Sequence, residues 1–184
     1  TLGLVAELIS TKGAHLADET ACEVMRSSVS RVDALAMLEE CLYYQGEVLL
    51  ADLNKYTNIL VSRLLKHAPV GAENITTTNE VTSRPFPVAQ ASPLAIVLFE
   101  AIENAIQYAF EDTSRVNYLH ITLGPDQADD TDANFKLVVR DNGPGIPPNI
   151  DPMSAPSSGL LIVASMARKL RGAVRVVNKD GTVL

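Results

Sequence analysis

The most informative stretch of the sequence is residues 141–147, which read DNGPGIP. It directly follows residues 135–140, FKLVVR, whose apolar and β-branched residues predict a strand. Gly143 and Gly145 let the backbone turn sharply and come close to a ligand, while Asp141 at the strand end can accept a hydrogen bond from an exocyclic amine. Taken alone, the stretch is equally compatible with an ordinary turn, because it is dense in turn-forming residues.

A second cluster lies upstream, in a predicted helix that begins at Ser92-Pro93 and runs to about Phe110. Glu100 and Asn104 are four residues apart, so they share one face of this helix. A carboxylate beside a carboxamide suits magnesium and phosphate chemistry. The same pair also occurs on ordinary solvated helix faces, so its meaning depends on what surrounds it.

A third cluster lies downstream, where residues 157–160 read SSGL at the start of a helix predicted from about Ser158 to Leu170. Gly159 and the free backbone amides of a helix start could meet a phosphate. A simple N-cap explains the same residues. No Gly-Lys-Ser/Thr follows any of the glycines, which excludes a P-loop.

The remaining segments predict an α/β sandwich with a mixed sheet, because strands and helices alternate irregularly. A helix is expected from Asp52 to about His67. Strands are expected at 74–81, 118–123, 135–140, 174–178 and 182–184.

Two amphipathic stretches open the chain and predict a helical hairpin over Thr1 to Tyr44, with the second helix beginning near Asp18 and running to Tyr43 and Tyr44. A hairpin has too little surface to bury its own apolar stripe. We therefore expect a homodimer through residues 1–44, in which two hairpins form a four-helix bundle.

Together, in this order and spacing, the three clusters resemble the ATP-binding domain shared by sensor histidine kinases, Hsp90-type chaperones, gyrase and MutL. Residues 31–43, RVDALAMLEECLY, are similar to the second dimerisation helix of the HisKA_2 and HWE-type histidine kinases. The loop from Ile146 to Ser157 resembles their short ATP lid. The resemblance implies an α+β fold: a dimerisation and histidine-phosphotransfer hairpin at 1–47, then an ATP-binding catalytic domain of the GHKL (Bergerat) type at 48–184.

The resemblance also implies roles for individual residues, with ATP and Mg²⁺ as cofactors. Glu100 matches the acidic residue that activates the attacking group, Asn104 the asparagine that holds magnesium, and Asp141 the aspartate that reads the adenine amine. The other implied nucleotide-binding residues surround the adenine or face the phosphates: Gly143, Gly145, Gly159, Leu160 and Thr182.

The implied activity is that of a two-component sensor histidine kinase. The γ-phosphoryl group of Mg-ATP would pass to a histidine and then to an aspartate of a response-regulator receiver domain. The acceptor is expected just upstream of residue 1, because His15, His67 and His120 do not match its position. The chain starts at Thr1 rather than methionine, which suggests a fragment.

Two positions depart from the family pattern. Gln107 and Tyr108 stand where a lysine or arginine followed by a histidine is usual, so one cation near the phosphates is missing. This departure favours an alternative function, a histidine phosphotransferase-like or pseudokinase scaffold whose ATP domain serves as a docking surface. The retained Glu100, Asn104 and Asp141 oppose it. A serine kinase of the anti-sigma type, or a related ATPase, would share the pocket without needing the hairpin.

The composition of the chain excludes several further classes of function. The 184 residues carry 15 basic and 22 acidic side chains, a net charge of −7, with no basic run, which argues against a nucleic-acid partner. No segment approaches the roughly 18 to 20 apolar residues of a membrane helix, so no membrane contact by this segment is expected. Cys22 and Cys41 predict neither a disulfide framework nor a zinc site. We expect a cytoplasmic protein, or the cytoplasmic part of a larger sensor.

Overall fold

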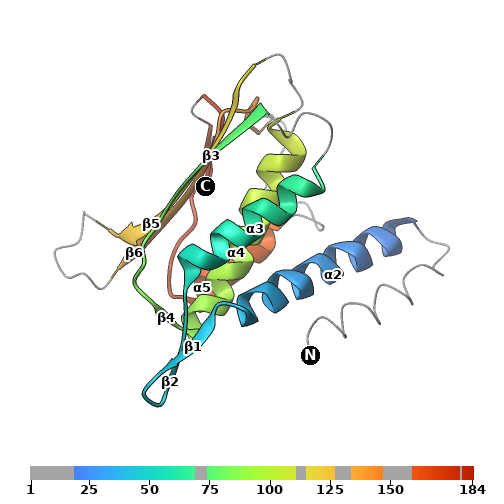
Figure 1. Cartoon of the computed structure of the whole chain (residues 1–184). Helices are drawn as coiled ribbons and strands as arrows, with labels where there is room; N and C mark the ends of the chain where they lie inside the picture. Colours follow the sequence, from blue (N-terminus) through green and yellow to red (C-terminus); the bar gives the residue numbers. More distant parts are fainter. Residues whose placement is uncertain (1–18, 69–73, 111–114, 127–133, 147–158, 179) are drawn as a thin grey trace.

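The structure is a computed structural model that describes residues 19–68, 74–110, 115–126, 134–146, 159–178 and 180–184. The predicted first helix of the hairpin and most of the predicted ATP lid lie outside these residues. Within them, helices pack on one face of a mixed sheet, and one long helix, α2, extends away from this body (Figure 1).

Helix α2 spans Glu19–Glu39 and is shorter than predicted. The expectation that it runs to Tyr43 and Tyr44 is wrong, because Leu42–Gln45 forms strand β1 and pairs antiparallel with β2, Val48–Ala51. Aromatic residues favour strands, and Gly46, with φ of 63°, begins the two-residue turn. The predicted domain boundary after residue 47 falls within this turn and stays a prediction.

Helix α3 spans Leu53–Lys66, and both of its ends are as predicted. The Asp52 side chain accepts a hydrogen bond from the Lys55 backbone N–H at 2.9 Å, which satisfies one of the unpaired amides of the first turn. His67 caps the other end. Strand β3, Ile75–Val81, also agrees with the sequence, and β4 is the short pair Phe86–Pro87.

Helix α4 spans Val88–Tyr108 and begins earlier than predicted. Ser92 does not cap it; instead the Ser92 hydroxyl donates to the Val88 carbonyl at 2.9 Å, one turn back. Pro93 lies inside the helix, in its second turn, where it removes one backbone hydrogen bond. The alanine-rich start of α4 favours helix, and buried Ala91 anchors it.

Five strands form the main sheet in the order β3-β5-β6-β8-β7. Strands β5, Asn117–Pro125, and β6, Phe135–Asp141, pair antiparallel over seven residues, whereas β3 runs parallel to β5. Helix α5, Gly159–Lys169, precedes the short strands β7, Val177–Asn178, and β8, Thr182–Val183. The mixed sheet is therefore confirmed, with final strands shorter than expected.

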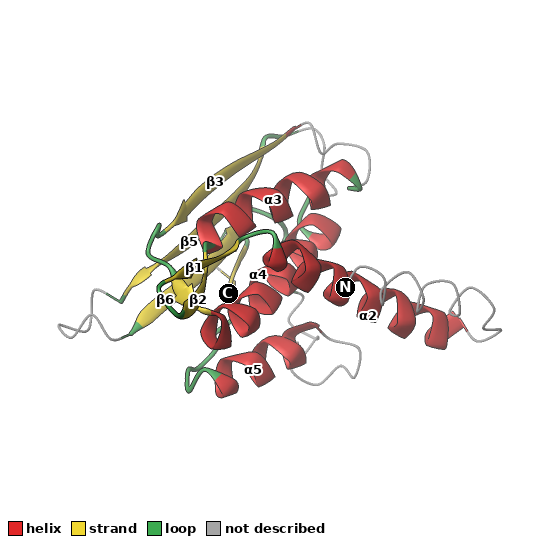
Figure 2. Cartoon of the chain, turned by 60° about the horizontal axis from the view of Figure 1, so that its bottom comes forward, coloured by secondary structure: helices red, strands yellow, loops and turns green. Residues whose placement is uncertain are grey.

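The core lies between the sheet and helices α3 and α4, and α5 runs alongside α4 (Figure 2). Its largest fully buried side chains include Tyr56, Phe99, Leu53, Leu60, Leu98, Ile102, Leu119, Ile121 and Leu123. The C-terminal part of α2 joins this core through Ala34, Met37, Leu38 and Cys41. This arrangement confirms the α+β fold class. No helix in the described part of the chain has both the length and the apolar character needed to cross a bilayer.

Candidate functional site

Glu100 lies in the middle of α4 and is only 2% exposed. Its partner is Arg31 of α2: the Arg31 Nε donates to Glu100 Oε1, and Nη2 donates to Oε2 at 3.3 Å. Both carboxylate oxygens are therefore engaged by one guanidinium. This bidentate pair links α2 to the helix that carries the predicted catalytic residue.

Asn104 follows one turn further along α4 and is partly exposed. Gly159 begins α5 directly beside it: a Cβ at Gly159 would overlap Glu100 Oε2 and lie 3.5 Å from Asn104 Nδ2. The predicted catalytic carboxylate, the predicted magnesium ligand and the predicted lid glycine therefore meet at one place. Leu160 follows Gly159 directly as the second residue of α5.

Asp141 ends strand β6 and is 6% exposed. Its Oδ1 accepts two backbone hydrogen bonds, from Gly143 at 2.8 Å and from Thr182 at 3.0 Å. The same carboxylate thus fixes the glycine loop and the start of β8. Within the described part of the chain, both of these hydrogen bonds go to Oδ1 and none goes to the other oxygen, Oδ2.

The loop after Asp141 is pressed against the end of α4. A Cβ at Gly143 would lie 2.5 Å from the Ala109 Cα, so no larger residue fits there without a backbone shift. Ala109 caps α4, the helix that also carries Glu100 and Asn104. The C-terminal part of α4 therefore connects the predicted adenine side of the site to the predicted catalytic side.

Asn178 of β7 holds the far end of the same loop. Its Oδ1 accepts from the Ile146 N–H at 3.0 Å, and its Nδ2 donates to the Ile146 carbonyl at 2.7 Å. A Cβ at Gly145, whose φ is 75°, would lie 3.0 Å from Asn178 Oδ1. The sequence contained no local signal for Asn178 or for Arg31, since both act through tertiary contacts with residues far away in the chain.

The two positions that depart from the family pattern both point outward. Gln107 and Tyr108 are exposed, and Tyr108 retains 65% of its surface. The described histidines have structural positions: His67 caps α3, and His120 Nε2 lies 3.4 Å from Glu80 Oε2 on the neighbouring strand. Neither lies in the group of site residues.

The donors present fit a magnesium ion that is bound jointly with phosphates. Mg²⁺ prefers oxygen ligands, keeps several waters and usually takes only one or two protein ligands beside the substrate phosphates. The Asn104 carboxamide offers such an oxygen at a partly exposed position. No group of three or more acidic, histidine or cysteine side chains in the described ranges could enclose an ion alone.

Glu103 lies one turn from Glu100 and has an altered acidity. Burial, and secondly the negative charge of Glu100, raise its pKa from 4.5 to about 6, while Arg31 acts in the opposite direction. Between these two pH values the folded state binds this proton more tightly than the unfolded state does. Stability is therefore lost as the pH rises through about 6.

We expect Glu103→Gln to raise Tm at pH 7.5, because it removes this buried charge. The gain is about 1 kcal/mol after allowance for solvent screening, or about 2–4 °C for a chain of this size. It should shrink as the pH falls through about 6 and vanish below 4.5. Thermal unfolding across this range measures it, with Glu47→Gln on the exposed β1–β2 turn as the control; a gain independent of pH would contradict the assignment.

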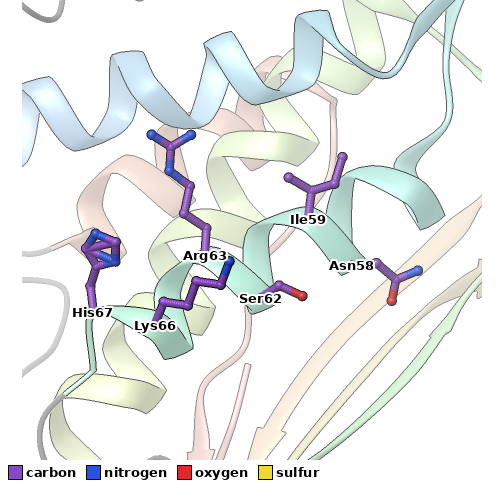
Figure 3. A pocket seen from close by; sticks show the side chains of 6 residues that line it. All are labelled: Asn58, Ile59, Ser62, Arg63, Lys66 and His67. Atoms are coloured by element: carbon purple, nitrogen blue, oxygen red, sulfur yellow. The ribbon is translucent and has the colours of Figure 1, made fainter.

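An open pocket of about 560 Å³ lies elsewhere, along α3 (Figure 3). Its lining residues come from that helix and its C-terminal cap: Asn58, Ile59, Ser62, Arg63, Lys66 and His67. None of them is a predicted site residue. The group around Glu100 and Asp141 is therefore defined by its hydrogen bonds and close approaches and not by this pocket.

Residues 89–184 match the family described as "Histidine kinase-, DNA gyrase B-, and HSP90-like ATPase" (HATPase_c), and residues 1–68 match the family described as "Histidine kinase" (HisKA_2). No curated protein sequence matches the chain.

Three solved structures are similar in fold. The histidine kinase domain of the Erythrobacter litoralis EL346 blue-light activated histidine kinase matches with a TM-score of 0.72 and 18% identity, over 98% of this chain and 90% of that one. The EL346 kinase itself matches at 0.66 and 21%, over 85% of this chain but 52% of that one. The mycobacterial sensor histidine kinase MprB matches at 0.54 and 22%, over 73% and 91%. Identities this low show a shared fold.

Proposed function

Because this chain belongs to the family of histidine kinase-, DNA gyrase B- and HSP90-like ATPases and has the catalytic core of a sensor histidine kinase, we propose that it phosphorylates a histidine with Mg-ATP. In this proposal Asp141, Gly143, Gly145 and Thr182 receive the adenine. Gly159 and Leu160, at the start of α5, face the phosphates.

One observation supports this proposal above the others: the two oxygens of Asp141 have separate tasks. Oδ1 holds the backbone amides of Gly143 and Thr182, so the carboxylate cannot rotate freely. Oδ2 then offers a fixed acceptor beside a loop whose glycines bring the backbone close. An amino group on a planar base is a suitable donor for such an acceptor.

The transfer step needs little covalent chemistry from the protein. The lone pair of one imidazole nitrogen attacks the γ-phosphorus, the bond to the β,γ-bridging oxygen breaks, and ADP leaves with that electron pair. The proton on the other imidazole nitrogen passes to Glu100. Asn104 would hold Mg²⁺, which supplies charge stabilisation for the phosphates when bound.

The proposed partners are a second copy of the chain, through residues 1–44, and a response-regulator receiver domain that takes the phosphoryl group to an aspartate. The apolar side chains on one side of α2 support the dimer. Val24 is 54% exposed, and Val32 and Leu35 are incompletely buried within one chain, so apolar surface remains for a partner helix. The chain spans about half the length of the light-activated kinase it resembles. We therefore also propose, as part of the same function, that the chain is cytoplasmic or is the cytoplasmic part of a larger sensor.

The test is a pair of measurements on the full-length protein. Calorimetric titration should give micromolar Mg-ATP binding that Asn104→Ala weakens about tenfold or more, and labelled ATP should give an acid-labile, base-stable phosphohistidine. Absence of nucleotide binding would overturn the proposal and favour the docking scaffold. Binding with phosphoserine, or with hydrolysis alone, would favour the serine kinase or ATPase.

A further inference from the structure

Arg31 is the only residue outside α4 with a recorded hydrogen bond to Glu100 in the described part of the chain, and it comes from α2. We propose that this contact is an autoinhibitory latch, in which Arg31 occupies the carboxylate that the acceptor histidine needs. The inference rests on the proposed function, because it concerns how the same site is controlled. Arg31 acts through Glu100 and is therefore a positioning residue.

The contact blocks the proton transfer that the proposed reaction requires. Glu100 must accept a proton from an imidazole, which needs a free oxygen within hydrogen-bond reach. Both carboxylate oxygens bond to Arg31, and the Glu100 side chain is only 3% exposed. Gly159 closes the other side, where even a Cβ would overlap Oε2. Among the described residues, Arg31 therefore occupies the approach that an imidazole would need to reach Glu100.

The contact is also of the strong kind. A guanidinium and a carboxylate form two parallel charge-assisted hydrogen bonds, and partial burial removes the competing water. The Arg31 side chain is 20% exposed against 3% for Glu100. Opening the latch therefore returns the arginine to water at small cost, whereas the carboxylate stays buried until a new donor replaces it.

The position of Arg31 on α2 makes the latch movable. The next turn is anchored in the core by Ala34, Met37 and Leu38. N-terminal to it, none of the α2 side chains described between residues 21 and 33 is buried, and this part of the helix extends away from the body (Figure 1). A bend or rotation just before Ala34 would carry Arg31 off Glu100 without opening the core.

The experiment compares Arg31→Ala with Arg26→Ala in the full-length protein. Arg26 lies on the same helix and is exposed, so its removal changes the charge equally without touching Glu100. Arg31→Ala should raise the initial rate of phosphohistidine formation at saturating Mg-ATP about tenfold or more, with the Kd for Mg-ATP unchanged within about threefold. Arg26→Ala should match the unmodified protein. An unchanged or lower rate for Arg31→Ala would overturn the latch.

Arg31→Lys keeps the positive charge but lacks the planar guanidinium that bonds both carboxylate oxygens. Its rate of phosphohistidine formation should therefore lie between those of the unmodified protein and Arg31→Ala. If Arg31→Ala does not fold, Arg31→Lys provides the test in its place. Mg-ATP binding without phosphohistidine in any variant would instead overturn the proposed function, and the latch with it.

Discussion

Asp141→Asn is expected to weaken Mg-ATP binding about 100-fold while leaving the fold intact. The asparagine carbonyl can take over the two hydrogen bonds that Oδ1 now accepts from Gly143 and Thr182. Its amide nitrogen then stands where Oδ2 was. An acceptor facing the adenine amine becomes a donor, and two donors cannot bond to each other. A 100-fold loss corresponds to about 2.8 kcal/mol, within the range for hydrogen bonds to a charged group.

The base-specific part of this effect can be separated from any general damage by replacing ATP with ITP, which carries a carbonyl in place of the amine. The unmodified protein should prefer ATP strongly. Asp141→Asn should lose most of that preference, because its new N–H₂ can donate to the carbonyl. Calorimetric titration with both nucleotides measures the ratio, and Tm should stay within a few degrees.

The control is Asn142→Ala, at the neighbouring position. The Asn142 side chain bonds the backbone of Tyr118 and Val116, away from the Asp141 carboxylate, so its loss should lower Tm without changing the ATP to ITP ratio. An equal loss of both nucleotides in Asp141→Asn would contradict base reading and leave Asp141 only its role in holding the loop.

Local patterns predicted the parts of the fold that depend on neighbouring residues. Asp52 caps α3, the strands at β3, β5 and β6 lie where expected, and α5 begins within one residue of the predicted start. The errors arose where tertiary packing outweighs a local signal. Tyr43 and Tyr44 follow a helical pattern, but a turn at Gly46 returns them into a hairpin with β2.

The candidate site shows the same division. The residue types at Glu100, Asn104 and Asp141 could be selected from the sequence because their spacing matches a family pattern. Arg31 and Asn178 could not, since each reaches its partner across a long separation, 69 residues for Arg31 and 32 for Asn178. Such contacts become visible only when the fold brings distant elements together.

The contact of Arg31 also bears on the basic residue that Gln107 replaces. Gln107 leaves an acidic chain without a basic side chain next to the asparagine, yet Arg31 brings a guanidinium to the same helix from α2. The charge therefore reaches Glu100 from α2 rather than from α4, the helix that carries the asparagine. Its effect on the reaction can then depend on where α2 lies.

Glu100→Gln is expected to slow phosphohistidine formation by about 10² to 10⁴-fold, the usual contribution of a positioned proton acceptor. The carboxamide fills the same space but cannot take the imidazole proton, so the Kd for Mg-ATP should stay within about threefold. Glu103→Gln, one turn along the same helix, removes an equal charge and should change the rate less than threefold. A large loss in both variants, or in neither, would contradict the role of Glu100.

Combining the two substitutions tests whether Arg31 acts through Glu100. In the latch, Arg31→Ala accelerates the reaction only because it frees the carboxylate, so it should give no acceleration once Glu100→Gln has removed that group. The coupling between the two changes should then equal the whole effect of Arg31→Ala, about 1.4 kcal/mol for a tenfold acceleration. If the acceleration persisted in the Glu100→Gln background, α2 would control the kinase by a route that bypasses this carboxylate, because the remaining effect could not involve proton transfer to it.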